Sequence, residues 1–190
     1  PVYKARIPVL VKNTFNPASK GTLINGNAPD QGKSPIKGIS SIDHIDLVTL
    51  QGPAMVGVTG TSARLFGALA KSGVNIILIT QASSEYSITF AVSPADTAEA
   101  SQAIKEEFER EILLNNELKI IIEQNLSLIA IVGEKMRNTP GISATLFRSL
   151  GRNGINVVAT AQGSSELNIS IVIKRENLQK FEEGIKEFAR

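Results

Sequence analysis

The sequence predicts an α+β protein in which one unit of strands and helices occurs twice. One observation is a gapless match of the chain to itself at an offset of 81 residues, with 18 identical positions between residues 52 and 108. Unrelated sequences would share about 3–4 positions over that length. The other observation is the order of segments, which is the same in both copies. Two ferredoxin-like βαββαβ units in tandem are therefore expected, each an antiparallel sheet with helices on one face.

Apolar patterning defines the segments of each unit. Short apolar runs that end in glycine predict strands, and Leu65, Phe66 and Leu69 have the spacing of one helical face. The first unit is expected to contain a strand at 45–52, a helix at 61–73, strands at 74–80 and 86–92, a helix from 96 to about 111 and a closing strand at 118–123. The second unit is expected to repeat these elements at 126–133, 142–154, 155–161, 167–173 and about 177–189. Ser62 and Ser143, near the helix starts, are expected to satisfy free backbone N–H groups.

The repeat also predicts the domain organisation. The second unit reaches Arg190 without a closing strand of its own. Residues 36–42 precede the first unit as 118–123 precede the second, so we expect 36–42 to complete the second unit. The leader before the repeat should contain a strand at 6–13 followed by a loop rich in Gly, Pro, Asn and Ser. The predicted domains are residues 1–35, 36–124 and 125–190.

Composition narrows the possible functions. Cysteine is absent and His44 is the only histidine, which excludes disulfides and weakens any case for zinc or a histidine-based triad. Lysines and arginines are dispersed among acids and the net charge is +2, so no nucleic-acid surface is expected. No apolar run approaches the ~18 residues of a membrane span. The segment 26–34 resembles a phosphate-binding loop, but its spacing is wrong and Pro35 follows it instead of a helix. We expect a cytoplasmic protein without catalytic residues, metal or cofactor.

The repeated polar residues are the candidates for ligand binding. Gln81 and Gln162 end the second strand of each unit, and Asn75 and Asn156 begin it. A primary amide offers two donors and one acceptor, which suits a small zwitterion or a hydroxyl. The first helix of each unit presents free N–H groups and the positive end of its dipole to a carboxylate. The expected ligand is an amino acid. Turn-capping remains an alternative for the asparagines, and the serines and glutamate after each glutamine are interpreted as hairpin residues.

The repeat resembles paired ACT domains, which sense amino acids, and specifically those of aspartate kinases. The segments LITQASSEYSITF (78–90), VGEKMRNTPGISATLF (132–147) and GINVVATAQGSSELNISIVI (154–173) are similar to the threonine-sensitive bifunctional aspartokinase–homoserine dehydrogenases. Residues 7–24 look like the last strand and loop of an aspartokinase catalytic domain. The resemblance covers essentially the whole chain.

This resemblance implies feedback regulation, in which threonine binds at interfaces between ACT units of a homo-oligomer and damps the catalytic domains. Gln81 and Gln162 match effector glutamines of the family, and Asn75 and Asn156 match residues that meet the ligand from a neighbouring unit. The other implied contacts come from the loops, at Gly60, Ser62, Asn138, Gly141 and Ser143. Gly57 stands where the family often has an aspartate. Two alternatives stay open: a structural oligomerisation module that binds no ligand, and a lysine-sensing regulatory region.

Overall fold

The computed structural model describes residues 2, 4–25, 35–114 and 117–188. The glycine-bearing segment at 26–34 lies outside the described residues. The chain divides into two compact units, Pro1–Lys33 and Ser34–Arg190, and both copies of the repeat belong to the second. Among the described residues, no helix is long and apolar enough to cross a membrane.

The smaller unit contains a short antiparallel hairpin. Strand β1 (Val9–Val11) pairs with β2 (Thr22–Ile24). The sequence predicted the first strand but assigned the second to a loop, because three apolar residues among Gly, Asn and Ser give too weak a pattern. Both strands leave apolar side chains exposed, and Phe15 between them is 98% exposed. A two-stranded hairpin cannot bury a core of its own.

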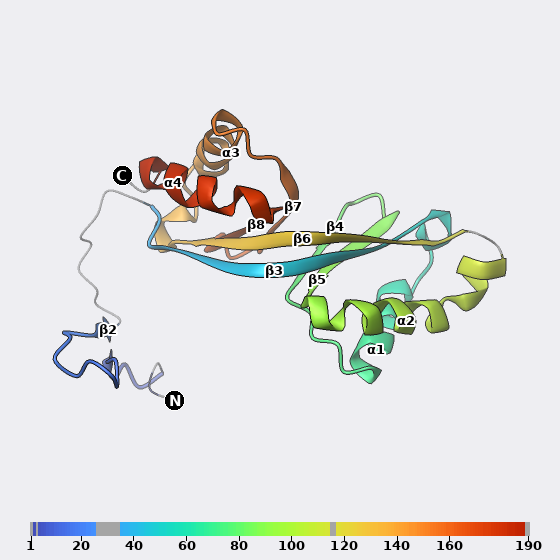
Figure 1. Cartoon of the computed structure of the whole chain (residues 1–190), viewed down its shortest axis with the longest axis horizontal. Coiled ribbons are helices and arrows are strands. Elements are labelled where there is room, and N and C mark those ends of the chain that lie inside the picture. The colour runs from blue at the N-terminus through green and yellow to red at the C-terminus, as the bar shows by residue number, and fades with distance from the viewer. Residues whose placement is uncertain (1, 3, 26–34, 115–116, 189–190) are drawn as a thin grey trace. The chain divides into compact units, whose positions relative to one another are not determined.

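The larger unit is built on one six-stranded antiparallel sheet (Figure 1). Its strands are β3 (Gly38–Gln51), β4 (Leu78–Gln81), β5 (Ser87–Val92), β6 (Lys119–Val132), β7 (Val157–Gln162) and β8 (Asn168–Lys174). They lie in the order β4-β5-β3-β6-β8-β7. The predicted fold class is confirmed, and the two repeats share a single sheet.

The two central strands serve both repeats. β3 and β6 are each 14 residues long. Residues 46–51 of β3 pair with β5 in the first repeat, whereas residues 38–42 pair with 128–132 at the start of the second repeat. β3 is therefore continuous from residue 38 to residue 51, whereas the sequence predicted a strand that begins at residue 45. His44 and Asn125 have positive φ values of 58° and 59°, and beside them the β3–β6 ladder shifts register without ending.

In the part of the chain that the structure describes, four α-helices cover the sheet, two in each repeat. They are α1 (Thr61–Lys71), α2 (Thr97–Glu107), α3 (Ile142–Arg152) and α4 (Leu178–Phe188). Figure 1 shows α1 and α2 near one end of the β3–β6 pair and α3 and α4 near the other. Each helix pair closes a core against its half of the sheet, and a third core joins residues of both halves, including Leu47 and Leu128. Burial on two faces explains why the second halves of β3 and β6 are mostly apolar and buried, whereas their first halves are mostly exposed.

Two helix predictions need correction. Ser62 and Ser143 do not cap their helices, because Gly60 and Gly141 occupy the N-cap positions and no side chain accepts a hydrogen bond there. Both glycines are left-handed, with φ of 87° and 90°, a conformation that favours glycine. The helix expected to reach about residue 111 ends as an α-helix at Glu107 and is followed by a π-helical turn at Arg110–Leu114.

Candidate functional site

The N-terminus of α1 opens into a cleft of about 380 Å³. Its lining comes from the strands, from the hairpin that follows β4, and from the start of α1 with the loop that precedes it. The lining residues are Met55, Gly57, Val58, Thr59, Gly60, Thr61, Ser62, Gln81, Glu85 and Ile88. Because Gly60 supplies no side chain to cap the helix, the first N–H groups of α1 are left for another acceptor.

The second repeat has an equivalent cleft of about 250 Å³ at the N-terminus of α3. It is lined by Met136, Thr139, Gly141, Ile142, Ser143, Ala144, Gln162, Glu166 and Ile169. Six of these positions carry the same residue as their counterpart 81 positions earlier in the first cleft: Met136, Gly141, Ser143, Gln162, Glu166 and Ile169. The duplication has kept the residues around the two clefts as well as the fold.

The structure gathers six of the nine sequence-predicted site residues into these clefts. Gly60, Ser62 and Gln81 line the first, and their counterparts Gly141, Ser143 and Gln162 line the second. In each repeat an amide side chain, at the end of β4 or β7, stands at the same cleft as a helix N-terminus.

The three predicted asparagines lie elsewhere. Asn75 and Asn156 are exposed and precede β4 and β7, at the opposite end of each strand from the glutamine. Six positions separate Asn75 from Gln81, which is about 20 Å of extended chain. One repeat alone therefore cannot bring both to the same small ligand. Asn138 does not line the second cleft, but its backbone N–H donates a hydrogen bond to Glu166 Oε2 at 2.9 Å.

Glutamates from the hairpin were missed as site residues. Glu85 lines the first cleft and Glu166 the second. The backbone N–H of Gly57 donates to Glu85 Oε2 at 3.1 Å, which matches the bond from Asn138 to Glu166. The identity of these glutamates in the two repeats was the available signal, but a charged residue in a polar turn is usually solvated.

Both clefts offer the groups that an α-amino acid requires. The uncapped helix N–H groups and the dipole suit a carboxylate, the glutamine amide suits a hydroxyl or other polar side chain, and a carboxylate faces the same space. Met55 and Ile88 in the first cleft, and their counterparts in the second, add apolar contact. The described residues contain no group of three or more His, Asp or Glu side chains placed to hold a metal ion.

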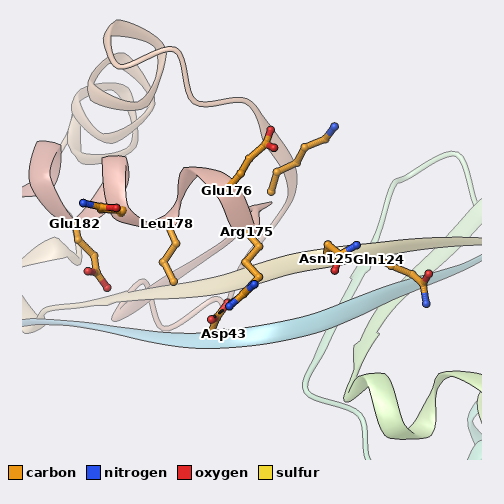
Figure 2. Close-up of a pocket in the computed structure, with 9 residues that line it drawn as sticks. Asp43, Gln124, Asn125, Arg175, Glu176, Leu178 and Glu182 are labelled. Atoms are coloured by element: carbon orange, nitrogen blue, oxygen red, sulfur yellow. Dashed lines mark hydrogen bonds and ion pairs between the residues drawn. The ribbon is translucent and has the colours of Figure 1, made fainter.

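A wider cleft of about 720 Å³ lies away from the predicted residues, beside α4 and the middle of β3 and β6 (Figure 2). Arg175 Nε donates to Asp43 at 3.0 Å, and Ser127 Oγ donates to the same carboxylate at 2.8 Å. These contacts, led by the hydrogen bond from Ser127, lower the pKa of Asp43 from its ordinary value. Asp43 is thus held as an anion that ties β3 to the second repeat.

The first repeat has a corresponding carboxylate contact with the strand that enters it, β6. Asp46 is 2% exposed and accepts hydrogen bonds from Thr97 Oγ1 at 2.7 Å and Gln124 Nε2 at 3.3 Å. Asp46 and Ser127 are equivalent positions, as are Asp43 and Gln124. In the first repeat the carboxylate, Asp46, lies on a strand segment of that repeat. In the second repeat the carboxylate, Asp43, lies on the strand that enters from outside it.

A cluster around Arg64 is confined to the first repeat. Arg64 on α1 contacts Glu107 Oε1 at 2.8 Å and Glu111 Oε1 at 2.7 Å, and its guanidinium lies 4.3 Å above the ring of Phe108. The hydrogen bond from Arg64 is the main cause that lowers the pKa of Glu111, against a smaller opposing effect of burial. Thr145 replaces this arginine in the second repeat. The cluster secures the end of α2 against α1.

Comparison with known proteins identifies the class. The ACT domain family model matches residues 48–108 and 129–183, which is more than half of the chain, and the chain belongs to this family. The two matched ranges coincide with the two repeats.

Its relatives include aspartate kinases. The chain is 41% identical over 181 residues to the bifunctional aspartokinase/homoserine dehydrogenase 1, chloroplastic, of Arabidopsis thaliana, covering 93% of this chain and 20% of that protein. It spans about a fifth of the length of such relatives. Among solved structures it is similar to Clostridium acetobutylicum aspartate kinase, with a TM-score of 0.81, 24% identity, and coverage of 98% of this chain and 42% of that one. Escherichia coli aspartokinase III in complex with lysine and aspartate gives a TM-score of 0.77 at 21% identity, covering 98% and 40% of the two chains.

Proposed function

We propose that this chain is the regulatory region of an aspartokinase of the bifunctional aspartokinase–homoserine dehydrogenase type, and that it binds threonine to mediate feedback inhibition. The observation that carries the proposal is the pair of equivalent clefts, each combining an uncapped helix N-terminus with a glutamine amide. The identity with a bifunctional relative across 93% of the chain supports the choice of enzyme type.

Threonine fits the chemistry of the clefts. Its carboxylate suits the helix N–H groups, and its hydroxyl can both donate to and accept from the amide of Gln81 or Gln162. Its side chain is small enough for a cleft of about 250 Å³, and its methyl group can contact Ile88 or Ile169. The same arrangement in both repeats predicts two threonine sites per chain.

A second copy of the chain is proposed to complete each site. Asn75 and Gln81 are placed symmetrically about Leu78, the first residue of the edge strand β4. If two β4 strands pair antiparallel about Leu78, Asn75 of one copy lies opposite Gln81 of the other. The same relation holds for Asn156 and Gln162 about Ala159 of β7. This arrangement gives the asparagines a role that one repeat alone cannot give them, and predicts a homo-oligomer.

Residues 1–35 are proposed to be the end of the kinase catalytic domain and a linker. The exposed apolar side chains of the β1–β2 hairpin support this proposal, because they are the surface that a larger core would cover. No catalytic role is proposed for the residues of this chain. A cytoplasmic location stays a prediction, and the Arabidopsis relative is described as chloroplastic.

Isothermal titration calorimetry of the purified chain tests the proposal. We expect threonine to bind with saturable heat and to raise the melting temperature, because a ligand of the native state stabilises that state by mass action. Serine, isoleucine and methionine serve as comparison ligands. If threonine gives neither heat nor a thermal shift in a folded, oligomeric sample, threonine sensing by this chain is wrong.

Lysine sensing is the second candidate, because a solved structure with a similar fold contains lysine. Lysine is longer and carries a second ammonium, whereas each cleft offers a single carboxylate, Glu85 or Glu166, beside the neutral amide of Gln81 or Gln162. Binding of lysine in preference to threonine would establish this candidate. Oligomerisation without binding of any amino acid would instead establish a purely structural module.

A further inference from the structure

We infer that Glu85 and Glu166 hold the ammonium group of the bound amino acid, and so make the two sites selective for zwitterions over simple carboxylates. The inference rests on the proposed function and assigns a role to residues outside the predicted site.

The first observation is that each glutamate is the one ionisable residue lining its cleft among the described residues. A helix N-terminus alone would accept any anion of suitable size. A fixed carboxylate in the same small space repels a simple anion and attracts a ligand that brings a positive charge with it. The pair of features therefore distinguishes an amino acid from the corresponding hydroxy acid.

The second observation is that the glutamates are held in the same way in both repeats. Glu85 uses Oε2 to accept the Gly57 N–H, and Glu166 uses Oε2 to accept the Asn138 N–H. The donor residue differs between repeats, but the backbone contact is retained. A carboxylate has about four acceptor positions on two oxygens, so one such bond orients the group and leaves Oε1 for an ammonium.

The third observation is the backbone conformation of these glutamates. Glu85 and Glu166 have φ values of 54° and 55°, in the left-handed region where Gly and Asn are the favoured residues. Each lies in a tight turn, closed by its own N–H to the carbonyl of Ala82 or Gly163. A turn alone would select Gly or Asn at this position. The presence of Glu in both repeats indicates that its side chain is required.

The test compares threonine with 2,3-dihydroxybutanoate, the analogue in which a hydroxyl replaces the amine, by calorimetry. The variants are Glu85→Gln, Glu166→Gln and the double variant, since glutamine keeps an oxygen for the loop N–H and removes the charge. Loss of a charged hydrogen bond should weaken threonine binding about 10–100-fold at the altered site. Binding of the analogue should stay equal or improve, so that the preference for threonine disappears in the double variant.

Ser84→Ala and Ser165→Ala are matched controls, because these serines lie in the same turns but do not line the clefts. They should leave threonine affinity unchanged. If the wild-type chain binds threonine and the folded double variant binds it equally well with the same preference, the ammonium assignment is wrong while the proposed function stands. If the wild-type chain binds neither compound, both are wrong.

Discussion

The two repeats share a backbone but differ in the contacts that secure them. Their long strands have equal lengths, their first helices begin at left-handed glycines, and their glutamates bind the same loop position. The supporting contacts differ: the first repeat has the Arg64 cluster and a buried Asp46, whereas the second has Thr145 and relies on Asp43 from the entering strand. The clefts are conserved between repeats while their supports have diverged.

Because their supporting contacts differ, we expect substitutions at equivalent positions to change the stability of the two repeats by different amounts. The closing strand of the first repeat follows its own helix α2 along the chain, while the closing strand of the second comes from residues 38–42 ahead of the first repeat. Each repeat therefore depends on a strand that the other repeat continues. Substitutions at equivalent positions test how far the supports are independent.

The largest effect is expected at the glycines before the two loops. A Cβ on Gly52 would lie 1.9 Å from the carbonyl oxygen of Glu117, and one on Gly133 would lie 2.0 Å from that of Pro35. Gly52 also has a φ of 153°, whereas Gly133 is in ordinary extended backbone. We expect Gly133→Ala to cost about 1–3 kcal/mol from overpacking, and Gly52→Ala to cost about 1–3 kcal/mol more from backbone strain.

Urea unfolding of the two alanine variants measures this difference. Gly133→Ala is the informative one for the second repeat, because it forces residues 35–36 away from the position that they occupy. A loss below about 0.5 kcal/mol for Gly133→Ala would mean that the contact with Pro35 contributes little to stability.

The next effect is expected at the buried carboxylate of the first repeat. Asp46→Ala leaves the Thr97 hydroxyl and the Gln124 amide without their shared acceptor, and should cost about 1–3 kcal/mol. Asp43→Ala is the matched change at the more exposed contact and should cost less. Equal losses for the two variants in thermal unfolding would contradict the distinction drawn from their burial.

A smaller effect is expected from the Arg64 cluster. Arg64→Thr, which installs the residue of the second repeat, should cost about 1 kcal/mol at neutral pH, since the ion pairs are partly exposed. Because the folded pKa of Glu111 is depressed, its contribution is complete above the ordinary glutamate pKa and is lost as the pH falls through the folded value.

Unfolding of wild type and Arg64→Thr across that pH range tests the sign. The stability difference between them should shrink on acidification. A difference that grows as the pH falls would show that the ion pair with Glu111 is not its source.

The smallest effect is expected at the two glutamines, and the measured quantity is the affinity for threonine. Gln81→Ala and Gln162→Ala should each weaken threonine at one site by about 2–10-fold, the range of a single neutral hydrogen bond. Stability without ligand should be unchanged, because both side chains are exposed. Unchanged threonine affinity in both variants would reduce the glutamines to hairpin residues.

Periodic features of the sequence predicted the repeat, the element order and the two cleft glutamines, whereas Gly60, Ser62, Gly141 and Ser143 followed from the family resemblance. The 81-residue match transfers one interpretation to both copies, and apolar runs identify strands that are buried on both faces. The continuity of β3 through His44 was not predictable. A single histidine in the sequence does not indicate a residue with positive φ inside a strand. Likewise, nothing local in Glu85 or Glu166 indicates that its carboxylate meets a loop 28 positions away.

The central claim is that the chain binds an amino acid at the α1 and α3 N-termini, and amide NMR spectroscopy during a threonine titration tests it most directly. The account predicts shifts in the backbone amides of Gly60, Ser62, Gly141 and Ser143, and in the side-chain amides of Gln81 and Gln162. The amide shifts of the residues around Asp43 and Arg175 should change little. Shifts confined to the Asp43–Arg175 cleft, with none at either helix N-terminus, would contradict the account.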